Sequence, residues 1–154
     1  MTEWIRVRAE EIRQVEKERK AERERLIVTA TELKARLEPF WKELVGVLEE
    51  SVKQFNIEFP DAERRIDQWE KNSPTAVTIR RTAYPAATVK IGLNQAGTSI
   101  PYAIGRTARK GANVVENQAS LTIGIVNGEV GYVEEHIHTH EDVARLFLDP
   151  FFSF

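Results

Sequence analysis

The three histidines of the chain lie close together in the sequence and could ligate a metal ion. His136, His138 and His140 occupy alternate positions, and Glu134 precedes them in the same alternation. On a continuous strand, alternate residues share a face, so these side chains could converge on a transition metal. A capping box beginning at Thr139 requires the strand to end first, which removes His140. The sequence thus allows a site of His136, His138 and Glu134, but a pH-sensitive patch or, preferably, an ordinary strand-to-helix junction explains the same residues.

Basic residues dominate the middle of the chain and could bind an anion. Residues 72–115 contain six basic residues and no acid, whereas residues 116–154 contain seven acids and one arginine. The candidate anion-binding residues are Arg80, Arg81, Arg106, Arg109 and Lys110. Arginine suits phosphate recognition, but aromatic stacking partners are few and the net charge is −2, so nucleic acid is not favoured. Pairing with the acids of this chain or of another subunit explains the same residues.

Signatures of other chemistry are missing from the sequence. It contains no phosphate-binding glycine loop, no dinucleotide fingerprint and no nucleophile elbow. It also contains no cysteine, so it has no disulfide, thiolate metal site or thiol nucleophile. We therefore assign no catalytic residue, expect no cofactor and favour a role other than catalysis.

The N-terminal part of the chain is predicted to be a long helix. Residues 3–37 contain no glycine or proline and are rich in strong helix formers. Within residues 14–25 only Val15 and Ala21 could enter a core, so this stretch is a solvated arm or one strand of a thin helical pair. Apolar periodicity resumes at Leu26, and Pro39 predicts a kink or a new helix there. We divide the chain into a charged helical arm, 1–38, and a helix-over-sheet domain, 39–154.

Two apolar segments are candidate contact surfaces. The candidate interaction residues are Leu26, Leu33 and Leu37 in the helix, and Phe151, Phe152 and Phe154 at the C-terminus. The helix segment suits a coiled coil between two copies or with another partner, but it could equally pack on the chain's own sheet. The terminal phenylalanines fit a position in the chain's own core or against a dimer partner.

The remainder of the chain predicts an α+β fold with a five-stranded antiparallel meander. Strands are expected near 75–82, 87–94, 99–105, 120–126 and 129–135, because apolar and polar residues alternate there. Asn127-Gly128 favours a two-residue hairpin that pairs Ile125 with Val130 and Gly124 with Gly131. A helix over 39–55 should cover the sheet, and a short helix should end near residue 148. Residues 57–71 weakly favour another short helix, and 106–118 a loop.

Together these features predict a soluble cytoplasmic protein. The first residues do not form a signal or transit peptide, and no run of about 18 apolar residues could cross a bilayer. The favoured function is self-association or protein interaction through the N-terminal helix, in a process that the residues do not specify. The alternatives are a small-ligand pocket between helix and sheet, and the histidine metal site.

Overall fold

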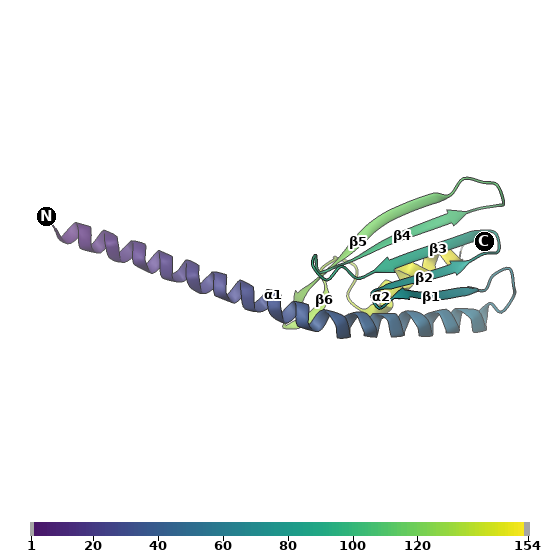
Figure 1. The fold of residues 1–154 in the computed structure, drawn as a ribbon, viewed down its shortest axis with the longest axis horizontal. Coiled ribbons are helices and arrows are strands. Elements are labelled where there is room, and N and C mark those ends of the chain that lie inside the picture. The colour runs from purple at the N-terminus through teal and green to yellow at the C-terminus, as the bar shows by residue number, and fades with distance from the viewer. Residues whose placement is uncertain (1, 153–154) are drawn as a thin grey trace.

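The computed structural model describes residues 2–152 and has the α+β architecture that the sequence predicts (Figure 1). One face of a curled antiparallel sheet is covered by helices, and the first half of the long helix projects away from it. The elements are α1 (Glu3–Glu58), β1 (Gln68–Ser73), β2 (Ala76–Arg81), β3 (Ala86–Gly92), β4 (Ser99–Thr107), β5 (Val115–Val126), β6 (Glu129–Tyr132), α2 (His140–Leu148) and the 3-10 helix η1 (Asp149–Phe152).

The helix α1 is continuous through Pro39, so of the two outcomes predicted for this residue, a kink or a new helix, the new helix is wrong. Proline removes one N–H donor and crowds the preceding turn, which an otherwise stable helix tolerates by bending. Figure 1 shows that the axis of α1 changes direction where the projecting half meets the half under the sheet. The two predicted segments are therefore one helix.

The sheet has six strands in sequence order, one more than predicted. The additional strand, β1, lies in the stretch for which a short helix was weakly favoured, and that prediction is wrong. Trp69 pairs with Ile79 of β2, while the last four residues of β1 are exposed. Because β1 is a mostly polar edge strand, it lacks the alternation by which the other strands were recognised.

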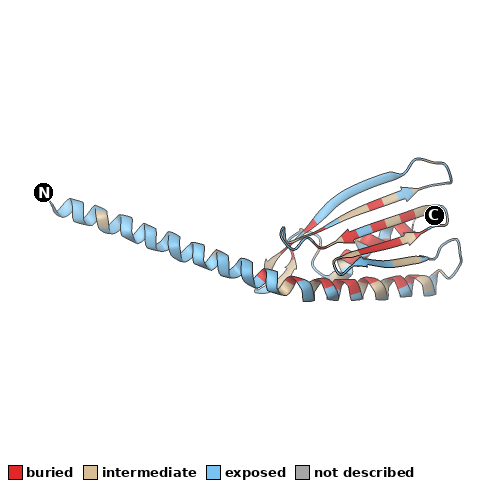
Figure 2. Cartoon of the chain, viewed as in Figure 1, coloured by how far each residue is buried: buried red, intermediate tan, exposed pale blue. Residues whose placement is uncertain are grey.

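The loop between β4 and β5 is shorter than predicted. The two strands pair as far as Arg106 opposite Val115, so residues 108–114 alone connect them. The first six residues of β5 are exposed, and this part of the strand lies at the edge of the sheet away from α1 (Figure 2). Without a buried face there is no apolar alternation to reveal a strand, and backbone pairing alone defines it.

The hairpin and the C-terminal helix form as predicted. Ile125 pairs with Val130 and Gly124 with Gly131, and Asn127 and Gly128 both have positive φ as a type I′ turn requires. Thr139 caps α2 in a capping box, in which its hydroxyl accepts from the Asp142 N–H and the Asp142 carboxylate accepts from the Thr139 N–H. Local turn and capping chemistry therefore fixes both features.

The core lies between the sheet and the second half of α1, with α2 and η1 closing one side (Figure 2). Leu33 is the first residue of α1 to enter this core, and Leu37, Leu44 and Leu48 follow on the same face. Trp41 is buried too, and its indole N–H donates to the Pro74 carbonyl at 2.9 Å. The contacts of α1 with this core therefore begin at Leu33.

Neither α1 nor the other helices of the described residues 2–152 are suited to crossing a membrane, because none is sufficiently long and apolar.

Candidate functional site

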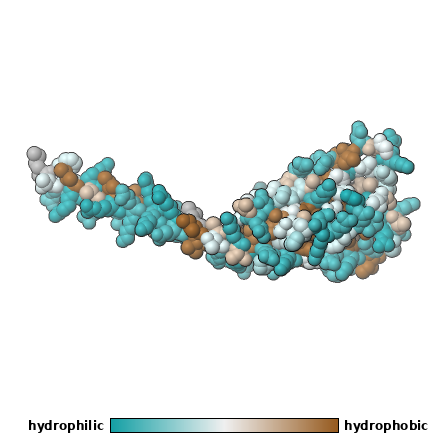
Figure 3. All heavy atoms as spheres, in the orientation of Figure 1, coloured by the Kyte–Doolittle hydropathy of each residue, from teal (hydrophilic) through white to brown (hydrophobic). Residues whose placement is uncertain are grey.

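The first half of α1 is a helix without a partner in this chain. We call residues 3–32 the arm. Its described side chains are exposed, except that of the partly buried Ala9. The apolar residues Ile5, Ile12 and Val15 are respectively 53%, 50% and 45% exposed. Figure 3 shows such hydrophobic residues distributed among hydrophilic ones along the arm. A helix that presents apolar side chains to water over this length is a candidate contact surface.

The structure divides the predicted interaction residues between the core and the surface. Leu33, Leu37 and Phe151 are buried within the chain's own core, so they offer no surface to a partner. Phe152 is 55% exposed and packs edge-on against Phe55 with ring centroids 5.0 Å apart. Phe154 and the side chain of Leu26 lie outside the described part of the chain. Of the four predicted contact residues whose side chains the structure describes, three are therefore buried in the chain's own core.

The predicted metal ligands lie in a connection and not on a strand. Because β6 ends at Tyr132, the alternation that was expected to align His136 with His138 does not extend to them. Glu134 instead accepts the Thr122 backbone N–H through Oε1 at 2.6 Å. Within residues 2–152 no group of three histidine, aspartate or glutamate side chains has an arrangement that could hold a metal ion. The predicted set of three ligands is therefore not assembled.

The backbone N–H groups around His138 serve the cap of α2. The N–H groups of His138 and Thr139 both donate to Asp142 Oδ2, at 2.9 and 3.1 Å. These hydrogen bonds, the one from His138 foremost, lower the pKa of the Asp142 carboxyl. This part of the histidine segment forms the strand-to-helix junction that the sequence favoured.

The predicted anion-binding residues are also separated. Arg80 lies on the open face of the sheet, where it donates to the side chains of Thr88 and Gln68. Arg81, the next residue on β2, points to the opposite face and is 1% exposed. Exposed positions at the end of β4 and in the following loop hold Arg106, Arg109 and Lys110. Because neighbouring residues of a strand face opposite sides, the five cannot form one site.

Arg81 is a structural residue. Its Nε donates to the Pro85 carbonyl at 3.0 Å, and one terminal nitrogen donates to the carbonyls of Arg64 and Phe151 at 3.2 and 2.8 Å. The guanidinium also lies 5.8 Å from the centroid of the Phe151 ring. Burial lowers the pKa of Arg81. This side chain therefore ties η1 and the segment after α1 to the sheet.

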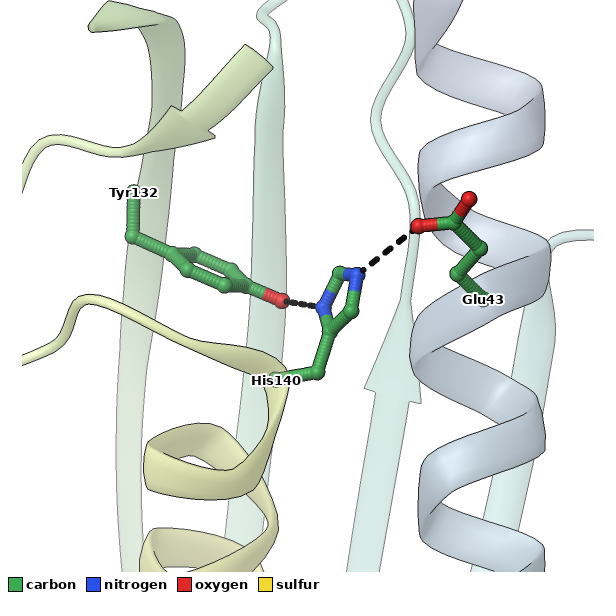
Figure 4. A network of polar contacts seen from close by, with 3 residues as sticks. All are labelled: Glu43, Tyr132 and His140. Atoms are coloured by element: carbon green, nitrogen blue, oxygen red, sulfur yellow. Dashed lines mark hydrogen bonds and ion pairs between the residues drawn. The ribbon is translucent and has the colours of Figure 1, made fainter. Parts of the chain in front are cut away.

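A polar network that the sequence did not predict connects α1, β6 and α2 (Figure 4). The His140 Nδ1 lies 2.8 Å from the Tyr132 hydroxyl, and its Nε2 lies 3.4 Å from a carboxylate oxygen of Glu43. The imidazole also packs on the Phe40 ring with centroids 4.7 Å apart. The capping box placed His140 in the first turn of α2, but its partners 8 and 97 residues away could come only from tertiary structure.

The electrostatics of this network favour the neutral forms of His140 and Tyr132. Burial lowers the pKa of His140, and the hydrogen bond and charge of Glu43 oppose the shift only in part. Burial, and secondarily the charge of Glu134, raise the pKa of Tyr132 far above its usual range. The neutral histidine can accept from Tyr132 through Nδ1 and donate to Glu43 through Nε2. A tyrosine so difficult to ionise suits a structural hydrogen bond and not proton transfer.

Mild acid is expected to destabilise the domain through His140. Its pKa is lower in the folded state than the value near 6.5 of the unfolded chain, so the unfolded chain takes up the proton first. Stability should therefore decline as the pH falls below about 6.5 and level off below the folded pKa. Urea unfolding between about pH 7.5 and 5.5 tests this. His140→Gln should remove part of the decline, and the control His136→Gln, at an exposed position, should retain it. Equal slopes for both variants would contradict the assignment.

Several surface hollows could receive a small molecule. One of about 540 Å³ lies on the open face of the sheet between Asn72, Lys90 and Gln118. Another of about 500 Å³ lies between α1 and α2 beside Phe152. A hollow of about 300 Å³ beside Trp41 lies between α1 and the β1–β2 turn, where the sequence predicts a ligand pocket. Its polar lining residues are Lys42, Glu49, Lys71 and Ser73. The ligand alternative stays a prediction.

Comparison of this chain with protein-family models, with curated proteins and with solved structures found no match to any of them.

Proposed function

We propose that this protein is a self-association module, in which the arm joins two copies of the chain and the helix-over-sheet domain is carried at its end. The observation that supports the proposal most directly is the exposure of Ile5, Ile12 and Val15 along one arm face. These residues follow the spacing of seven and three that defines a coiled-coil seam. The domain has no use for this face, because its own core begins only at Leu33.

Pairing of the arm would offset an unfavourable exposure of apolar surface. Each buried aliphatic side chain contributes about 1.5–3 kcal/mol relative to full exposure. An isolated helix gains this only from a partner, and most helical stability in proteins comes from such packing. The charged residues around the apolar positions keep the unpaired chain from non-specific aggregation and restrict the partners that fit.

The test is the solution mass of the full chain measured by light scattering at several concentrations. The intact chain is expected to have twice the mass of one 17.6 kDa chain. The double variant Ile12→Glu, Val15→Glu places charges in the seam and should raise the dissociation constant by about 100-fold. The control Val28→Glu alters an exposed arm residue off the seam and should leave the mass unchanged. A single-chain mass for the unaltered protein at all concentrations would refute the proposal.

A further inference from the structure

We propose that the two arms pair in antiparallel orientation, with the two-fold axis of the dimer crossing between Lys20 and Ala21. This inference rests on the proposed self-association and specifies its geometry. The partner is a second copy of this chain, and the contact surface is the arm face that carries Ile12 and Val15, with Ile5 beyond the end of the overlap. Two features support it, the order of charges in the middle of the arm and the heptad position of two of those charges.

The charges in the middle of the arm reverse sign about a central point. Residues 16–25 read EKERKAERER. Four pairs of residues equidistant from the centre carry opposite charges, namely Glu16 with Arg25, Lys17 with Glu24, Glu18 with Arg23, and Arg19 with Glu22. An antiparallel partner presents this sequence in reverse order, so each acid of one copy lies at the same level along the rod as a base of the other. In a parallel pair in register, each seam residue would instead meet the identical residue of the other copy.

The heptad places one of these pairs in the seam itself. If Ile5 and Ile12 occupy position a and Val15 position d, then Arg19 is the next a residue and Glu22 the next d residue. In antiparallel coiled coils an a residue packs beside a d residue of the partner. Arg19 of each copy then faces Glu22 of the other, so the two charges that interrupt the apolar seam compensate each other. A parallel pair would place Arg19 against Arg19, which repels.

The same register agrees with the flanks and the ends of the arm. Next to the seam, Glu18 of one copy lies beside Arg25 of the other, again with opposite charges. Residue 9 lies opposite residue 32, the last residue of the arm, so the overlap spans about 36 Å at about 1.5 Å per residue. The overlap ends just before Leu33, the first residue of α1 that is buried in the chain's own core. Beyond that point the side of α1 that faced the partner packs against the chain's own domain. The two domains lie at opposite ends of the rod.

Cysteine cross-linking distinguishes the two orientations. The chain has no cysteine, so an introduced thiol is the only one present. The antiparallel register places Ile12 opposite Thr29, and each of them about 25 Å along the axis from its own counterpart. After subunit exchange and mild oxidation, a mixture of the Ile12→Cys and Thr29→Cys chains should form the mixed disulfide. Neither variant alone should cross-link. Self-linked Ile12→Cys would overturn the antiparallel geometry and leave the self-association intact.

Charge reversal provides the second test. Arg19→Glu places an acid opposite Glu22 of the partner at both symmetry-related contacts. It should raise the dissociation constant of the dimer by about tenfold. Adding Glu22→Arg restores opposite charges and should restore the affinity. Lys17→Glu makes the same change of charge on the outer side of the helix and serves as the matched control. A dimer that Arg19→Glu leaves unchanged, or that the double variant fails to rescue, would overturn the register. A monomeric unaltered chain would instead refute self-association itself.

Discussion

Replacing Arg81 with methionine is expected to lower the free energy of unfolding by about 3 kcal/mol. Methionine preserves the apolar stem but removes the guanidinium, leaving the carbonyls of Pro85, Arg64 and Phe151 without this donor. A buried group that loses its hydrogen bond costs about 1–3 kcal/mol. The methionine variant also avoids the cost of burying the charged guanidinium, which offsets part of this loss of stability. Urea unfolding, followed by the fluorescence of the buried Trp41, measures the difference.

Two further variants separate the hydrogen bonds of Arg81 from its charge. Arg81→Lys retains the charge, but a compact ammonium cannot reproduce the planar fork, so stability should be recovered only in part. Arg80→Met is the matched control, since this neighbouring arginine is partly buried on the open face and donates to the side chains of Thr88 and Gln68. It should cost about 1 kcal/mol or less. If Arg81→Met were as stable as the control, the anchoring role would be refuted.

Replacing Phe147 with alanine is expected to cost about 3–5 kcal/mol, the usual range for a fully buried phenylalanine. Its side chain is 0% exposed and packs against the Tyr102 ring with centroids 5.0 Å apart. The cavity left behind lies between α2 and the sheet, where rigid elements on both sides limit relaxation. The same unfolding measurement applies, and the midpoint should shift with little change in the slope.

Phe152→Ala is the matched control, because it removes the same side chain from the adjoining helix η1 at a position that is 55% exposed. Its ring packs against Phe55 and Phe59 along one side of the α1–α2 groove. A loss of about 1 kcal/mol or less is expected. Equal losses for the two variants would show that the terminal segment, and not α2 alone, closes the core.

The local elements of the fold are predictable from the sequence where the chain carries a short-range signal. Asn127-Gly128 determines a two-residue hairpin because its turn needs two residues with positive φ. Thr139 and Asp142 determine the start of α2 through reciprocal capping bonds. The two elements whose prediction failed, β1 and the first half of β5, are exposed and polar, so burial imposes no period on them.

The candidate sites also divide into features that short-range sequence signals predict and features that depend on tertiary structure. The composition of the arm by itself determined a charged helix with few apolar residues, because helix propensity is a property of neighbouring residues. Three features depend on tertiary structure alone. Arg81 anchors η1 through the Phe151 carbonyl, and His140 contacts both Tyr132 and Glu43. The side chains of α1 enter the core from Leu33 onward. These contacts join residues far apart in the sequence, and only the packing of α1 and α2 on the sheet brings them together.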